Sequence, residues 1–224
     1  MATSLKLYSY WRSSAAWRVR IALNLKQLAY EIIPVHLVAN GGEQHALEYR
    51  EVNPQRFVPT LLDGARVFRQ SLAIIEYLDE VHAGTMSLLP STARDRARVR
   101  AIAQVVACDI HPLNNLRVMQ FLEREFATPQ VERDRWTRHW IVEGFRAVEA
   151  LLSESASTGL YCDGDVPTLA DVCLVPQVYN ARRFGVDMSE FPIIERIDQQ
   201  CLGLAAFDAA RPENQPDAPA QPAM

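Results

Sequence analysis

The chain has 224 residues with a formal net charge of −4, and its 49% hydrophobic and 22% charged residues suffice for one or two globular domains. A mildly acidic chain lacks the broad basic surface that sequence-independent nucleic-acid binding needs, so we expect no nucleic-acid partner. No apolar run reaches the roughly 20 residues of a membrane-spanning helix, and the N-terminus lacks a signal-peptide core, so we expect a cytoplasmic protein with no membrane partner.

The cysteines are scattered along the sequence. They form no C-x-x-C pair and no His/Cys cluster at zinc spacing, so the sequence indicates neither a disulfide framework nor a metal site. We expect four buried free thiols, at Cys108, Cys162, Cys173 and Cys201.

Residues 1–84 are predicted to form a small α/β domain. Its elements in chain order are a strand at 5–10, a helix through Trp17 to Leu28, a strand at 29–37, an irregular helix at 41–52, a hairpin at 57–68 around Asp63-Gly64, and a helix at 70–82. A β-α-β-α-β-β-α order of this length is typical of a thioredoxin-like domain.

After a turn-rich linker at 85–92, residues 93–211 show only helical periodicity. They predict a helix at 94–110 that is kinked near Pro112, a helix at 131–155, a helix at 168–184 and a short helix from Ile193 to Cys201. Thr168 and Asp171 have the spacing of a capping box. The Pro- and Ala-rich tail at 212–224 is expected to be extended or disordered.

Two polar pairs stand at predicted helix starts. Ser13 and Ser14 follow the first strand, with Arg12 beside them, and Gln70 and Ser71 begin the last helix of the same domain. A helix start offers unpaired backbone amides and a positive dipole end, which bind anions. A serine that only caps its helix is the alternative at Ser13 and Ser14. In a thioredoxin-like topology both starts lie on one edge, so the two pairs could hold opposite ends of one small anionic ligand.

Five stretches carry a resemblance to a known family: SYWRSSAAWRVRIAL, NPQRFVPTLLDG, QSLAIIEYLDE, DIHPLNNLRV and TLADVCLVPQVYNARRFGVD. In this order they resemble the zeta class of glutathione S-transferases, from about Leu5 to the tail. The resemblance implies the glutathione S-transferase fold, an α/β N-terminal thioredoxin-like domain followed by an all-α C-terminal domain. It also implies glutathione as cofactor and a homodimer.

The resemblance further implies which residues bind glutathione. Gln70 and Ser71 would hold the γ-glutamyl end, the strand around Val58 would pair with the peptide backbone, and Pro59 would be a cis-proline. The thiol would lie at Ser13 and Ser14, where a helix start favours the thiolate. Gln44, Asn115 and His111 also match glutathione contacts of the family. For His111 the alternative is a structural role in supporting the local helix.

The implied reaction is the cis–trans isomerisation of maleylacetoacetate to fumarylacetoacetate, with Ser13, Ser14, Arg12 and Arg183 as catalytic residues. The substrate carries carboxylates, which guanidinium groups bind by paired hydrogen bonds. Arg12, Arg117 and Arg183 are the candidates for that contact, whereas Arg18 and Arg20 are expected to be solvated or paired with acids of the second domain.

Position 15 departs from the family pattern. It holds Ala15 where the family usually has a cysteine. We expect this change to alter thiolate tuning and not to abolish turnover, because the reacting sulfur belongs to glutathione. Two alternatives remain open, namely maleylpyruvate as the substrate, which Arg117 also favours, and a non-catalytic glutathione-binding protein of the same fold.

Overall fold

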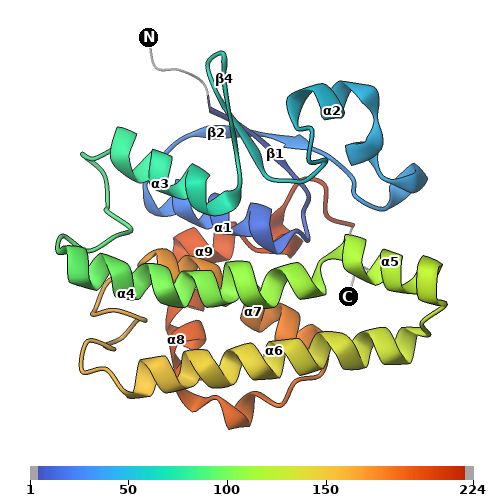
Figure 1. The fold of residues 1–224 in the computed structure, drawn as a ribbon. Helices are drawn as coiled ribbons and strands as arrows, with labels where there is room; N and C mark the ends of the chain where they lie inside the picture. Colours follow the sequence, from blue (N-terminus) through green and yellow to red (C-terminus); the bar gives the residue numbers. More distant parts are fainter. Residues whose placement is uncertain (1–4, 220–224) are drawn as a thin grey trace, which may run out of the picture. The chain divides into compact units, whose positions relative to one another are not determined.

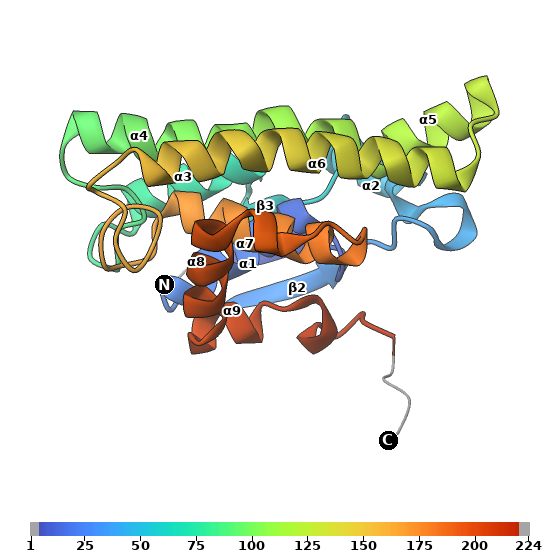
Figure 2. The ribbon, with the colours of Figure 1, turned by 90° about the horizontal axis from the view of Figure 1, so that it is seen from below.

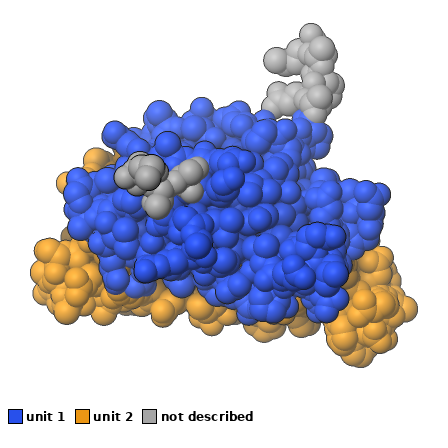
Figure 3. Space-filling view, turned by 90° about the horizontal axis from the view of Figure 1, so that it is seen from above, with its two compact units in different colours: residues 1–88, 203–224 blue, residues 89–202 orange. Residues whose placement is uncertain are grey.

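The computed structural model describes residues 5–219 and divides the chain into two compact units. The first unit comprises residues 1–88 and 203–224, and the second comprises residues 89–202 (Figure 3). None of the helices within residues 5–219 is both long enough and apolar enough to cross a membrane.

A mixed four-stranded sheet forms the centre of the first unit. The strands are β1 (Leu5–Ser9), β2 (Tyr30–Pro34), β3 (Thr60–Asp63) and β4 (Arg66–Arg69), in the order β2-β1-β3-β4. β1 runs parallel to β2 and antiparallel to β3, and β3 and β4 form an antiparallel hairpin. Burial alternates along β1, as expected for a strand with one face on the core.

Two helices pack beside each other in this unit, α1 (Ser14–Leu25) and α3 (Ser71–Val81) (Figure 1). The short helix α2 (Leu47–Val52) follows two single 3-10 turns, Ala39–Gly41 and Glu43–His45. The order β-α-β-α-β-β-α confirms the predicted thioredoxin-like domain.

The second unit is entirely helical in the described residues. Its α-helices are α4 (Ala93–Gln104), α5 (Leu116–Phe126), α6 (Gln130–Ser153), α7 (Leu169–Arg183) and α8 (Pro192–Leu202). α7 is the most buried of them and packs against α4 and α8 (Figure 2). The predicted kink near Pro112 is a π-helical turn, Val105–Ile110, followed by a 3-10 turn, His111–Asn114.

The C-terminal segment differs from the prediction. Helix α9 (Ala205–Ala209) packs beside α1, although the whole second unit separates the two in sequence (Figure 2). The second unit therefore ends near residue 202, not at 211. The tail from 212 to 218 is ordered by a 3-10 turn, Pro212–Asn214, and by hydrogen bonds, because its polar side chains find partners nearby: Gln215 Nε2 donates to the carbonyl oxygen of Arg211, and Asp217 Oδ2 accepts the amide of Trp11. Residues 220–224 of the predicted tail lie outside the described residues.

Candidate active site

Ser13 caps helix α1. Its backbone is extended (φ −69°, ψ 114°), and its Oγ accepts a hydrogen bond from the amide of Ala16 at 3.2 Å. The amide of Ser13 in turn donates to the carbonyl oxygen of Tyr10 at 2.9 Å. The capping role considered from the sequence is therefore present, and the hydroxyl hydrogen remains able to donate to an anion. Ser14, also half-buried, occupies the first turn, whose backbone amides have no partner within the helix.

Arg12 lies immediately before this helix start. Its guanidinium carbon is 5.4 Å from the centre of the Trp11 ring, a cation–π distance. Within residues 5–219 no carboxylate forms an ion pair with Arg12, and its side chain is half-buried. A positive charge thus stands beside Ser13 with no ion-pair partner in the part of the chain that the structure describes.

Arg18 and Arg20 are not solvated, contrary to the sequence-based expectation. Arg18 is 2% exposed and Arg20 is fully buried. Arg20 donates to Ser9 Oγ (2.9 Å) and to the carbonyl oxygens of Tyr10 (3.4 Å) and Trp11 (3.0 Å). Burial lowers the pKa of Arg20 to about 10, although Tyr30 and Asp217 act in the opposite direction. Arg20 therefore organises the loop before α1 from inside the first unit, where its partners are mostly backbone carbonyls.

The start of α3 is linked to α1 through Arg18. Arg18 Nη1 donates to the Oγ of Ser71, which is 7% exposed, at 3.4 Å. Gln70 caps the helix with a left-handed backbone (φ 69°), and its exposed amide donates to Gln55 Oε1 at 2.8 Å. Because Arg18 lies one turn beyond Ser14 on α1, this bond brings the two predicted helix starts into one neighbourhood.

Val58 and Pro59 precede β3, and the peptide bond between them is cis, as the resemblance implied. The carbonyl oxygen of the preceding Phe57 accepts hydrogen bonds from Tyr49 and Asn53, both contributed by the α2 region. Neither the amide nor the carbonyl group of Val58 has a hydrogen-bond partner within residues 5–219. One edge of the backbone is therefore left available for an extended peptide.

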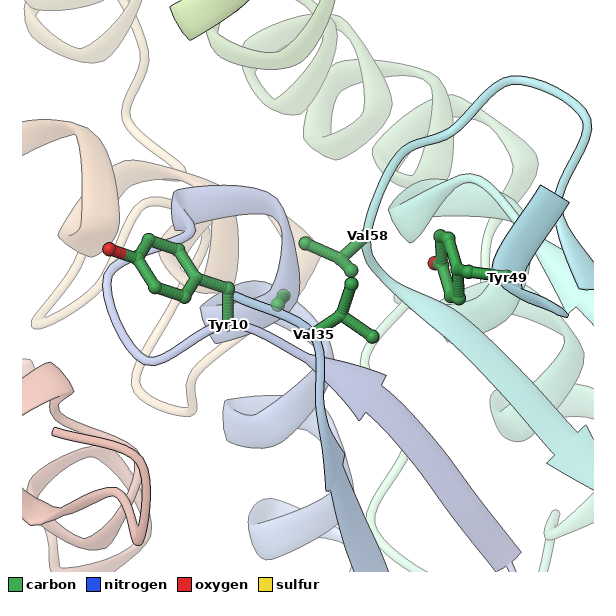
Figure 4. Close-up of a cluster of buried hydrophobic side chains, with 5 residues drawn as sticks. Tyr10, Val35, Tyr49 and Val58 are labelled. Carbon is green, nitrogen blue, oxygen red and sulfur yellow. The ribbon is translucent and has the colours of Figure 1, made fainter. Parts of the chain in front are cut away.

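A cluster of buried apolar side chains fixes this backbone. Val35 and Val58 point toward one another, with Tyr10 and Tyr49 on either side (Figure 4). These four residues come from the loop before α1, the position directly after β2, α2 and the segment before β3. Their packing holds the α1 start and the cis-proline segment together.

Gln44 is 6% exposed, and its Nε2 donates to the carbonyl oxygen of Leu37 at 3.2 Å. Its Oε1 is buried and has no partner among residues 5–219. The Gln44 side chain can occupy this place because residue 42 is a glycine: its φ is 96°, and any Cβ there would clash with the Gln44 side chain. Gln44 thus retains an unused hydrogen-bond acceptor beside the site.

The other predicted residues belong to the second unit. Asn115 caps α5, and its Oδ1 accepts the backbone amide of Arg117 at 3.1 Å. Arg117 itself is exposed on the first turn of the helix. His111 is half-buried in the turn before it. Arg183 is exposed at the end of α7, with its guanidinium carbon 4.9 Å from the centre of the Phe184 ring.

Asn114 was missed by the sequence analysis. Both polar atoms of its side-chain amide are buried, and neither has a partner among residues 5–219. Its only signal in the sequence was the doubled asparagine before Leu116.

The chain's own thiols do not fit the reacting role. Cys162, Cys173 and Cys201 are buried as predicted, whereas Cys108 is exposed in the π-helical turn, which corrects that expectation. Burial raises the pKa of the thiols of Cys162 and Cys201, so these side chains stay protonated. The family cysteine position at the α1 start is Ala15, so helix α1 contributes no thiol of its own there. Within residues 5–219 no cluster of His, Cys, Asp and Glu side chains could hold a metal ion.

Residues 7–86 match the family model for the glutathione S-transferase N-terminal domain. The chain is 52% identical over 215 residues to a probable maleylacetoacetate isomerase of Vibrio cholerae, with 96% of this chain and 99% of the relative covered. It is also 48% identical to a maleylpyruvate isomerase of a Ralstonia species, over 95% and 99% of the two chains. A holo structure of a zeta-class maleylpyruvate isomerase superposes with a TM-score of 0.92 at 47% identity, covering 96% of this chain and 100% of the other. The chain belongs to the zeta class of the glutathione S-transferases.

Two further relatives were solved with ligands. The maleylacetoacetate isomerase of Methylobacterium extorquens AM1 contains bound malonate and glutathione (43% identity, 96% and 100% coverage, TM-score 0.92). That of Anaeromyxobacter dehalogenans contains dicarboxyethyl glutathione and citrate in its active site (42% identity, 98% and 96% coverage, TM-score 0.85).

Proposed function

We propose that this zeta-class protein isomerises maleylacetoacetate to fumarylacetoacetate with glutathione as its cofactor. The observation that carries the proposal is the start of α1, where the Ser13 hydroxyl, the free amides of the first turn and the unneutralised Arg12 stand together. Such a site attracts a thiolate and an acidic substrate at once. The maleylacetoacetate isomerases among its relatives support this choice of reaction.

The groups at the first unit's sheet edge fit glutathione, an anionic tripeptide. The unpaired amide and carbonyl of Val58 suit its peptide backbone, and the start of α3 at Gln70 and Ser71 suits its γ-glutamyl carboxylate. Gln44 would supply a further hydrogen bond through its unused Oε1. In the second unit, Asn115 and His111 remain proposed contacts on the basis of the resemblance.

Glutathione held by these residues would supply the thiolate needed for reversible addition to the conjugated cis double bond, which would permit rotation about that bond. Ser13 and the dipole of α1 would lower the pKa of a thiol placed at the helix start. Arg12 and Arg183 would bind the carboxylates of the substrate. Each donor directed at negative charge developing on the ketone oxygen would contribute about 3 kcal/mol to the transition state.

Maleylpyruvate is the second candidate substrate. Ala15 and Arg117 both match the maleylpyruvate type in the resemblance, and the Ralstonia relative is a maleylpyruvate isomerase. The relatives compared above are isomerases in either case, which favours catalysis over a non-catalytic glutathione-binding protein.

The test is to measure kcat/KM for both substrates with and without glutathione. We expect turnover to require glutathione and to be faster with maleylacetoacetate; a strong preference for maleylpyruvate would replace the first proposal by the second. Arg12→Lys should raise KM for the preferred substrate about tenfold, because an ammonium group cannot bind a carboxylate through two parallel hydrogen bonds. The exposed Arg66→Lys is the matched control and should leave KM unchanged. Glutathione binding without isomerisation of either substrate would contradict both proposals.

We further propose that the enzyme is a cytoplasmic homodimer. The resemblance supports the dimer, and the expectation of a cytoplasmic protein rests on the sequence. Sedimentation equilibrium of the purified protein decides the first point, because a species of 25.3 kDa alone would exclude the dimer.

A further inference from the structure

The segment that follows α9 returns to the loop in front of α1. We call residues 210–218 the C-terminal strap. Its conformation is fixed by Gln215, which is 7% exposed and whose Nε2 donates to the carbonyl oxygens of Ala209 (3.0 Å) and Arg211 (2.7 Å). The carbonyl oxygen of Gln215 also accepts the amide of Ala218 at 3.0 Å. These bonds place Asp217 at a defined position.

The strap holds Trp11 from two sides. Asp217 Oδ2 accepts the backbone amide of Trp11 at 2.8 Å. Arg20 donates to the carbonyl oxygen of Trp11 at 3.0 Å and, through Nε, to the carbonyl oxygen of Ala210 at 3.1 Å. Both backbone polar groups of Trp11 are therefore bound by charged side chains, one of which belongs to the strap and one of which is tied to it.

Trp11 in turn supports the residues assigned to the reaction. Its ring lies against the guanidinium of Arg12, and the amide of Ser13 is bound to the carbonyl oxygen of the preceding Tyr10. A shift of the Trp11 backbone would move Arg12 directly and the Ser13 cap through this short loop. Charge-assisted hydrogen bonds to a backbone amide are among the stronger ones, so Asp217 can resist such a shift.

We propose that Asp217 is a positioning residue for isomerisation, which fixes Arg12 and Ser13 through the backbone amide of Trp11. The proposal rests on the function proposed above for these two residues. The other carboxylate oxygen of Asp217, Oδ1, is buried and has no hydrogen-bond partner among residues 5–219. Within these residues the Asp217 carboxylate therefore binds the amide of Trp11, through Oδ2.

The experiment compares Asp217→Ala, Asp217→Asn and Asp208→Asn in the full chain. Asp208→Asn is the matched control, since it removes one negative charge from the same C-terminal region but affects only the surface pair with Arg211. Asp217→Asn keeps an oxygen that can accept the Trp11 amide. It should therefore retain most of the native kcat/KM and most of the protection of this amide from exchange. Hydrogen exchange of the Trp11 amide reports the bond itself, whether or not the protein is active.

We expect Asp217→Ala to accelerate exchange at Trp11, to raise the substrate KM more than it changes kcat, and to lower kcat/KM about tenfold or more. The absorbance of the bound thiolate should titrate at a higher pH. Faster exchange with unchanged kcat/KM and an unchanged titration overturns the proposal, as does unchanged exchange. If the native protein turns over neither substrate, the proposed function fails, while exchange and the glutathione titration still decide the role of Asp217.

Discussion

Gly144 of α6 packs against Ile110 at the end of the π-helical turn with no room for a side chain between them. A Cβ at position 144 would overlap the Cγ1 and Cδ1 atoms of Ile110. Ile110 is 1% exposed, so its side chain would have to shift within the closely packed interior. This contact fixes the turn that precedes His111 and Asn114.

We therefore predict that Gly144→Ala lowers the free energy of unfolding by about 1–3 kcal/mol, the usual cost of overpacking. Urea denaturation measures the loss. In an Ile110→Ala background the same substitution should cost less, because the clashing atoms are gone. Gly84→Ala is the control, since nothing lies within 4 Å of a Cβ there. Equal losses at positions 84 and 144 would show that the close contact is not the cause.

Ser13→Ala removes the hydroxyl that caps α1 and faces the proposed thiol position. We expect a stability loss of about 1 kcal/mol and a rise in the pKa of bound glutathione, seen as loss of thiolate absorbance near neutral pH. Thr92→Ala removes the corresponding cap of α4, whose Oγ1 accepts the Asp95 amide at 3.1 Å. That variant should lose similar stability with no change in the thiolate titration. The same titration curve for both variants would exclude the role of Ser13 in holding the sulfur.

Arg20→Lys keeps the charge but not the shape of the side chain. The guanidinium donates to four groups, on Ser9, Tyr10, Trp11 and Ala210, which a compact ammonium cannot reach together. We expect a loss of about 2–4 kcal/mol in the free energy of unfolding, because buried carbonyl groups are left unpaired. The exposed Arg94→Lys should cost almost nothing. A stable Arg20→Lys protein would mean that water replaces the lost donors.

Asp171 predicts a specific pH dependence. Its carboxylate accepts the amides of Cys162 (2.8 Å) and Thr168 (2.7 Å), yet burial raises its pKa above the ordinary value of 3.8. The folded state then binds this proton more tightly than the unfolded state. The contribution of Asp171 to the free energy of unfolding is complete when the pH is below 3.8, and it is lost as the pH rises through the raised pKa.

Asp171→Asn should abolish this dependence of the free energy of unfolding on pH. At neutral pH it should also lower that free energy by about 1–3 kcal/mol, because the amide and hydroxyl of Thr168 lose their acceptor. Urea denaturation in steps upward from pH 4 measures both effects. Asp95→Asn is the comparison, because hydrogen bonds from Thr92 and Arg94 lower the pKa of Asp95, so its contribution is lost as the pH falls. A slope that persists in Asp171→Asn would assign it to another group.

The sequence predicted the elements whose signals are local. Alternation in β1, the Asp63-Gly64 hairpin and the Thr168–Asp171 capping box all depend on neighbouring residues, and each is present. The helix starts at Ser13 and Ser71 were predictable for the same reason.

What could not be predicted depends on contacts that are distant in sequence. Arg18 and Arg20 look like surface residues by type. Their burial is supported by hydrogen bonds that the sequence does not reveal, from Arg18 to Ser71 and from Arg20 mostly to backbone carbonyl groups. α5 was missed although its apolar and polar residues separate by face and Asn115, a favourable N-cap residue, marks its start. Residues 212–218 of the strap were expected to be extended or disordered, because their composition carries no apolar period. The partner of Asp217 in this segment is Trp11, which lies about 200 positions away in sequence.

The return of the last residues to the first unit has a consequence for biosynthesis. A ribosome makes residues 1–88 long before residues 203–219, so the N-terminal unit leaves the exit tunnel without α9 and without the partner of the Trp11 amide. The helical unit is complete in sequence once residue 202 has emerged, whereas the N-terminal unit still lacks α9 and Asp217 at that point. The loop that carries Arg12 and Ser13 therefore gains the support of Asp217 only after the whole helical unit, residues 89–202, has been made.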